Sequence, residues 1–158
     1  MMSFMHETLY GLFRDADKTL NAAGLEPGQE VLEVGCGPGF FTIPAARIVG
    51  ATGRVLALDV NPLAVEHVRK KIEAAGASNV KVMLSNIAQA DAPDQSFDLA
   101  FLFGLAYPIG DKDKIWSSLQ RLLKPEGTIA VEGRLRPPGE FFQFIERQGR
   151  ISRYRKIG

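Results

Sequence analysis

The sequence is poor in the residues that form disulfides and bind metals. Its 158 residues include one cysteine, Cys36, and two histidines, His6 and His67. A single cysteine forms no disulfide within the chain and is typical of a protein in a reducing compartment. With so few cysteines and histidines, no set of zinc-type ligands has a credible spacing, and we expect no metal site.

Long apolar runs are also absent. No stretch of the sequence reaches the roughly 20 apolar residues that a membrane-spanning helix needs. Residues 1–10 have neither the basic start nor the apolar stretch of a signal peptide. We therefore expect a cytoplasmic protein without a membrane partner. The length predicts one domain, residues 1–158, which can bury enough surface to fold without disulfides.

The chain has almost no net charge, +1, but the charge is unevenly distributed. Residues 134–156 hold seven cations against two acids, which leaves this segment at +5 and the remaining chain at −4. Such a segment is either a solvated sheet edge that resists aggregation or a surface for an anionic partner. We favour the first interpretation and do not expect nucleic acid as a partner.

Short apolar runs alternate with longer amphipathic segments, which is the pattern of strand–helix–strand units around a parallel sheet. The expected class is therefore α/β, a Rossmann-like doubly wound sheet whose first five strands are parallel. The predicted strands are 30–34, 54–59, 80–84, 97–103 and 128–132. The predicted helices are 4–23, a segment ending near 49, 61–76 and 111–123.

Several residues predict where these elements begin and end. Pro44 fits a helix only in its first turn, so we expect Thr42 to cap that helix. Asn61 and Pro62 form a good helix start, and Gly76 a good stop. Residues 124–127, Lys-Pro-Glu-Gly, predict a turn before the fifth strand.

The C-terminal tail has two interpretations. Residues 140–148 fit either a helix or the first strand of a hairpin that continues through 151–157; we favour the antiparallel hairpin. The hairpin would leave one edge strand exposed, with an apolar patch formed by Phe141, Phe142, Phe144 and Ile145. Such a patch is most simply buried in a two-fold dimer, so we expect a homodimer through this region.

A glycine-rich loop follows the first predicted strand. Gly35 and Gly37 lack a Cβ, which lets a ligand approach the backbone closely. Glu33 places a carboxylate near the end of the apolar strand, where a ligand ammonium would offset its burial. Asp59 ends the second strand, from which a carboxylate accepts both ribose hydroxyls. These partners together suggest an amino acid joined to a nucleoside.

The sequence resembles the class I S-adenosylmethionine-dependent methyltransferases, of the small-molecule ubiquinone-biosynthesis and precorrin type. The residues that carry the resemblance occur in the family's order over about 26–133. They are Glu33-Val34-Gly35-Cys36-Gly37-Pro38-Gly39, Leu58-Asp59, Ser85-Asn86-Ile87-Ala88, Ser96-Phe97-Asp98-Leu99-Ala100-Phe101 and Leu122-Leu123-Lys124-Pro125-Glu126-Gly127-Thr128-Ile129. This ordered set is far more specific than any one motif.

The resemblance implies S-adenosylmethionine as cofactor, S-adenosylhomocysteine as product, and the strand order 3-2-1-4-5-7-6. The residues that it implies for cofactor binding are Glu33, Gly35, Cys36, Gly37, Gly39, Asp59, Val60, Asn86, Ile87 and Phe103. Apart from the resemblance, we interpret Cys36 as a small loop residue and Phe103 as a residue of the hydrophobic core. Position 86 departs from the family, which usually has an acid where this chain has Asn86, so we expect a changed contact with adenine.

The methyl acceptor is expected to be a small, mostly apolar molecule near the ends of the fourth and fifth strands. Residues 103–107 are mainly apolar and offer no carboxylate as a base. Tyr107 and His6 are the only catalytic candidates near this region. Two alternatives stay open: a non-catalytic S-adenosylmethionine-binding module and a nicotinamide-dependent oxidoreductase. The second lacks its usual last glycine, because Phe40 or Thr42 stands there.

Overall fold

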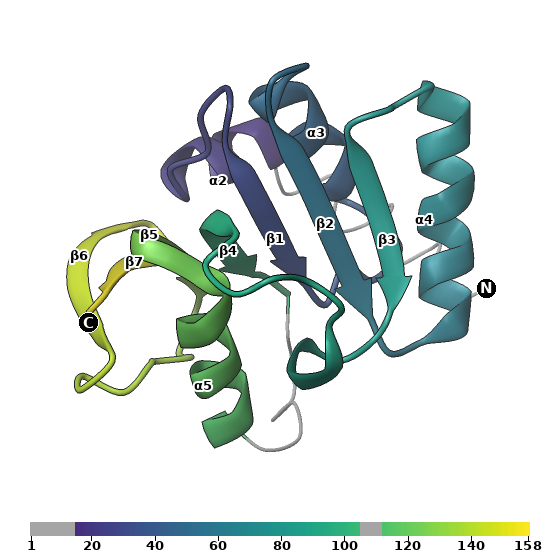
Figure 1. Cartoon of the computed structure of the whole chain (residues 1–158). Helices are drawn as coiled ribbons and strands as arrows, with labels where there is room; N and C mark the ends of the chain where they lie inside the picture. Colours follow the sequence, from purple (N-terminus) through teal and green to yellow (C-terminus); the bar gives the residue numbers. More distant parts are fainter. Residues whose placement is uncertain (1–14, 105–111) are drawn as a thin grey trace.

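The computed structural model describes residues 15–104 and 112–158, and its centre is a seven-stranded sheet. The strand order is β3-β2-β1-β4-β5-β7-β6 (Figure 1). Strands β1 to β5 pair in parallel, whereas β7 pairs antiparallel to both β5 and β6. The strands are β1 (Glu30–Val34), β2 (Arg54–Asp59), β3 (Val80–Leu84), β4 (Phe97–Leu102), β5 (Leu123–Glu132), β6 (Phe142–Gln148) and β7 (Ile151–Lys156). The expected fold class and order are confirmed.

Helices cover both faces of the sheet. They are α2 (Ala16–Ala22), α3 (Thr42–Val49), α4 (Pro62–Ala75), the 3-10 turn η1 (Ile87–Gln89) and α5 (Lys112–Leu122). Successive residues of β1 pack on opposite faces: Val31 lies in the apolar cluster with α2 and α3, and Leu32 in the cluster with α5. Figure 1 shows α5 on the opposite side of the sheet from α2 and α3. Burial on both faces explains why β1 and β4 are apolar nearly throughout.

The residues predicted to begin and end α4 do so, whereas the residue predicted to cap α3 does not. Asn61 caps α4 by accepting from the Leu63 N–H at 2.9 Å, and Gly76 closes it in the left-handed conformation. In α3 the N-cap is Phe41, which makes no side-chain cap, so the expectation that Thr42 caps this helix is wrong. The Thr42 hydroxyl donates to Glu33 instead. Pro44 lies in the first turn, as its missing N–H requires.

The fifth strand begins earlier than predicted. Leu123 already pairs with Phe97, and the ladder resumes at Thr128 opposite Leu99. The predicted turn 124–127 is therefore a bulge within β5, where Glu126 has a φ of 67°. The sequence signalled the irregular backbone correctly but not the pairing that precedes it.

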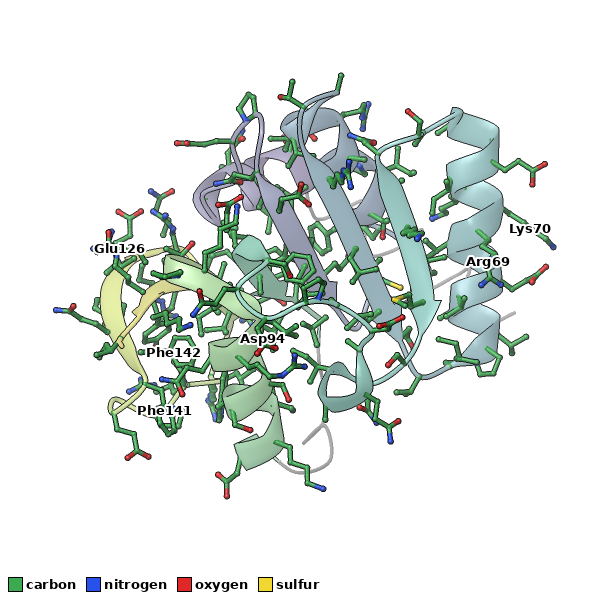
Figure 2. The ribbon with its side chains drawn as sticks, in the orientation of Figure 1. Arg69, Lys70, Asp94, Glu126, Phe141 and Phe142 are labelled. Carbon is green, nitrogen blue, oxygen red and sulfur yellow. The ribbon has the colours of Figure 1, made fainter. Side chains whose placement is uncertain are left out.

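The tail forms the hairpin, not the helix. Phe142 packs against Trp116 of α5 with ring centroids 6.2 Å apart, and it is 2% exposed (Figure 2). The expected apolar patch is thus smaller than predicted, because Phe142 belongs to the core and Phe144 is the exposed phenylalanine at 56%.

Only Ala16–Ala22 of the expected helix 4–23 lies in the described part of the chain as helix; residues 1–14 are outside it. Within the described residues, no helix is both long and apolar enough to traverse a lipid bilayer.

Candidate cofactor and acceptor site

The glycine-rich loop turns the chain sharply at the carboxyl end of β1. Gly35, Gly37 and Gly39 all have positive φ, at 74°, 53° and 89°. The N–H groups of Gly35 and Cys36 both donate to the Leu58 carbonyl at 2.9 Å, which fastens the loop to the end of β2. A Cβ added to Gly37 would meet no atom within 4 Å, so this glycine borders open space. The loop therefore has room for a ligand beside its backbone.

Glu33 is a buried carboxyl group directly beneath this loop. It is 2% exposed, and its Oε1 accepts a 2.6 Å hydrogen bond from the Thr42 hydroxyl. Burial raises the pKa of Glu33 to about 8, the nearby Asp59 charge raises it too, and the Thr42 hydrogen bond opposes them. A cationic group at this position would stabilise the ionised form.

Asp59 joins the loop to the end of β2. Its Oδ2 accepts from the Gly37 N–H and its Oδ1 from the Asn61 N–H, both at 2.9 Å. The two hydrogen bonds hold the carboxylate in one orientation beside the loop. Each oxygen has further lone pairs, so a half-buried carboxylate held in this way can accept from two neighbouring hydroxyls.

The residues after β3 occupy the next position along this edge of the sheet. The Asn86 amide oxygen accepts from the Gln89 N–H at 2.9 Å and so caps η1. The Ile87 side chain points into the core and is 5% exposed. Three apolar side chains are exposed here: Val60 (65%), Leu63 (78%) and Leu84 (55%). The sequence analysis named only Val60 of these three.

Phe103 and Cys36 are both buried. Phe103 is 5% exposed and packs against Phe41 and Phe101, with ring centroids 5.1 Å and 4.8 Å away, so its core interpretation holds. Burial and the charges of Glu33 and Asp59 raise the pKa of the Cys36 thiol. A thiol that resists ionisation is a poor nucleophile, which agrees with its interpretation as a small loop residue.

The ends of β4 and β5 bring a carboxylate to the expected acceptor region. Glu132, the last residue of β5, accepts from the Gly104 N–H through Oε1 at 3.3 Å. The sequence analysis missed this residue, although an acid ending an apolar strand is the same signal that singled out Glu33. Tyr107 and His6 lie outside the described residues. Among residues 15–104 and 112–158, no group of three or more His, Cys, Asp or Glu side chains could hold a metal ion.

Comparisons with known proteins agree with this geometry. Residues 25–134 match a family model described as a methyltransferase domain. The ubiquinone/menaquinone biosynthesis C-methyltransferase UbiE of Psychromonas ingrahamii is 37% identical over 115 residues, which cover 72% of this chain and 45% of that protein. The UbiE protein of Escherichia coli is 35% identical over 133 residues, covering 83% of this chain and 51% of the relative. The chain thus spans about half the length of these curated relatives.

A solved structure matches nearly end to end. The S-adenosylmethionine-dependent methyltransferase of Aquifex aeolicus superposes with a TM-score of 0.72 at 25% sequence identity, covering 90% of this chain and 88% of that one. The matching domain, the strand order and the acid-flanked glycine loop lead to one family. The chain belongs to the class I S-adenosylmethionine-dependent methyltransferases.

Proposed function

We propose that the protein transfers the methyl group of S-adenosylmethionine to a carbon atom of a small, mostly apolar acceptor. The observation that carries the proposal is the pair of carboxyl groups, Glu33 and Asp59, fixed on either side of the glycine loop. The carbon acceptor is supported by the relatives, which are C-methyltransferases of quinone biosynthesis.

The geometry of the site supports binding of this cofactor. In this proposal Glu33 faces the ammonium of the amino-acid part, and Asp59 accepts the ribose hydroxyls. Gly35, Cys36, Gly37 and Gly39 supply the close backbone surface. The exposed Val60 and the backbone of Asn86 and Ile87 would contact the adenine base. Phe103 would contact the methyl end of the cofactor. When bound, the cofactor supplies an electrophilic methyl group on a sulfonium. The protein aligns the acceptor with it and excludes competing water.

The proposal treats the C-terminal cations as a solvated sheet edge and not as a nucleic-acid surface. Arg153 pairs with Glu146 at 2.9 Å, and the Lys156 ammonium donates to the Leu123 carbonyl at 2.9 Å. Arg147 donates to the Gly149 carbonyl at 2.8 Å. Arg147 and Arg153 thus have partners within the hairpin, and Lys156 has one at the start of β5. The proposal also includes a single functional domain, residues 1–158, a homodimer formed through β6, and a cytoplasmic location in keeping with the single cysteine.

Binding and turnover test the proposal together. Calorimetry should show binding of S-adenosylmethionine and S-adenosylhomocysteine and none of NAD. Mass spectrometry should show one added methyl group on 1,4-dihydroxynaphthalene, a small reduced-quinone probe with a free ring carbon beside each hydroxyl-bearing carbon. Binding without turnover on any such ring would favour the non-catalytic binding module. Binding of NAD alone would favour the oxidoreductase.

A further inference from the structure

Two adjoining cavities lie between α3 and α4. The first has a volume of about 410 Å³ and includes Gly39 and Phe40 in its lining, just before α3 begins. The second, of about 320 Å³, includes Gly50 and Gly76, where the two helices end. Both cavities are lined by Ile43, Arg47 and Ala75. Because α3 has eight residues, the cavities together form a groove roughly 12 Å long beside it.

The walls of this α3–α4 groove are mainly apolar. In the first cavity they include the partly exposed Phe40 and Ile43. In the second cavity the Asn79 amide donates to the carbonyls of Ala46 and Gly50 at 2.9 Å and 2.8 Å, so these carbonyls at the end of α3 already have a partner. An extended peptide in the groove would press its own N–H and C=O groups against apolar walls, whereas an acyl chain has no such groups. The walls therefore favour an acyl chain.

The described residues that line the groove include two cations and no acid. Arg47 is exposed and lines both cavities, and the partly buried Lys71 lines the first. A Cβ placed on Gly39 would lie 3.4 Å from Lys71 Cδ, so the lysine stem passes over the loop before α3. Burial lowers the pKa of Lys71, and an anion beside its ammonium would offset the lost hydration. Because α3 and α4 both end at the second cavity, their terminal carbonyls disfavour an anion there and leave the first cavity as its place.

The groove is distinct from the site proposed for methyl transfer. Glu33 and Asp59, the two carboxyl groups of that site, line neither cavity. Of the residues assigned to the cofactor, Gly39 alone lines the groove, and it offers no side chain. A ligand in the groove and a cofactor at the glycine loop would therefore contact different side chains, and we expect both to bind at the same time.

We propose that the α3–α4 groove is a second binding site, for an unbranched aliphatic carboxylate of medium chain length. The carboxylate lies between Lys71 and Arg47, whose planar guanidinium matches the two carboxylate oxygens. The acyl chain runs past Ile43 and Ala75 toward the end of α3, along walls that require no hydrogen bonds from it. Binding is reversible, and no covalent bond forms or breaks. The assignment does not depend on methyl transfer or on its acceptor.

Calorimetry with decanoate, kept below its micelle concentration, tests the proposal on the full chain. We expect saturable binding to a single class of site. Butyrate has the same head group but a short chain, and it should bind at least about tenfold more weakly because it leaves most of the apolar wall in water. Adding S-adenosylhomocysteine should change the affinity for decanoate by no more than about twofold, since the two ligands contact different side chains.

Two double variants separate the head-group site from the net charge of the protein. Arg47→Gln with Lys71→Gln should weaken decanoate binding by about tenfold, because two partly solvated ion pairs are lost. The matched control is Arg69→Gln with Lys70→Gln, which removes the same charge from two exposed positions of α4 that do not line the groove (Figure 2). Its affinity should stay within about twofold of wild type.

A third variant and the methyl resonances locate the acyl chain. Ala75 is exposed at the end of α4, so a larger side chain is tolerated there. Ala75→Phe should weaken decanoate binding by about tenfold or more, because the ring fills the part of the groove that both cavities share. In wild type, decanoate should shift the carbon-13 methyl resonances of Ala74 and Ala75 and leave those of the exposed Val60, after β2, in place.

Three outcomes would overturn the second site. The first is the absence of saturable decanoate binding. The second is an affinity that Ala75→Phe leaves unchanged, or that the two double variants reduce equally, since net charge and not the groove would then attract the anion. The third is a shift of the Val60 resonances in place of the alanine resonances, which would put decanoate at the cofactor edge. Circular dichroism of each variant checks that a loss of binding is not a loss of fold.

Discussion

Glu33 and Asp59 are both acids at strand ends, yet their surroundings differ. Asp59 is half-buried, and its carboxylate accepts hydrogen bonds from two backbone N–H groups, which hold it in one orientation. Glu33 is buried, and its pKa is raised to about 8. Its protonated form is therefore favoured at neutral pH in the absence of a cation. We infer that Glu33 makes the unliganded site sensitive to pH and Asp59 fixes the loop geometry.

The raised pKa of Glu33 predicts a stability change with pH. The folded pKa of about 8 lies above the ordinary value of 4.5, so the folded state holds a proton that the unfolded chain releases in this window. Stability should therefore fall as pH rises from about 4.5 to about 8, by on the order of a few kcal/mol.

Urea denaturation of the unliganded protein across this window, compared with Glu33→Gln, measures the effect. The variant lacks the titrating group, so its stability should fall less steeply. Thr42→Val should extend the fall to higher pH and enlarge the total loss of stability, because it removes the hydrogen bond that lowers the pKa of Glu33. Identical pH dependence in wild type and Glu33→Gln would show that Glu33 is ionised in the folded protein.

Asp59→Ala should weaken the binding of S-adenosylhomocysteine by roughly 1–3 kcal/mol, because hydrogen bonds to a charged acceptor are lost. Asp59→Asn keeps one acceptor oxygen and should lose less. Asp91→Ala, an exposed acid after η1, is the control and should bind as wild type does. Calorimetry gives the dissociation constants, and circular dichroism checks the fold. An unchanged constant in a folded Asp59→Ala protein would remove Asp59 from the site.

At the scale of elements, the hairpin is attached to the sheet through β7, and an aromatic contact joins it to α5. Strand β7 pairs with β5 over residues 151–155, and Phe142 of β6 packs on Trp116. Phe144 lies two residues farther along β6, contacts Tyr154 at 5.6 Å between ring centroids, and remains 56% exposed. The same residue type thus has a core role and a surface role on one strand.

This difference gives a matched pair of variants. Phe142→Ala should destabilise the protein by about 3–5 kcal/mol, since it leaves a cavity between the hairpin and α5. Phe144→Ala should lose about 1 kcal/mol or less, because the side chain is already largely in water. Urea denaturation at low protein concentration measures both. Equal losses would mean that the hairpin is not anchored through Phe142.

At the scale of the whole molecule, what the sequence could predict depended on the range of the interaction. The alternation of apolar runs and helices predicted the strands of the parallel sheet, and the strand-end acids pointed to the loop, because these signals are local. The predicted cap of α3 was wrong because the Thr42 hydroxyl donates to Glu33, nine residues earlier in the chain. Glu132 was missed because its hydrogen bond with the Gly104 N–H depends on which strand lies beside β4. The burial of Ile87 and Phe142 likewise follows from packing against α5.

The last prediction concerns assembly. In the described part of the chain, β6 ends the strand order and pairs only with β7, so its outer edge is open for pairing. Phe144 and Ile157, which is 41% exposed, provide apolar surface there. Two copies that join their β6 edges about a two-fold axis would bury both features. We expect a dimer in sedimentation velocity experiments.

Phe144→Lys should shift the protein to monomer, because it adds a cation to an interface that already carries the exposed Arg147 and Arg155. Phe144→Leu keeps the apolar surface and should remain dimeric. A wild-type monomer at high protein concentration, or a dimer that Phe144→Lys leaves intact, would place any assembly away from this edge.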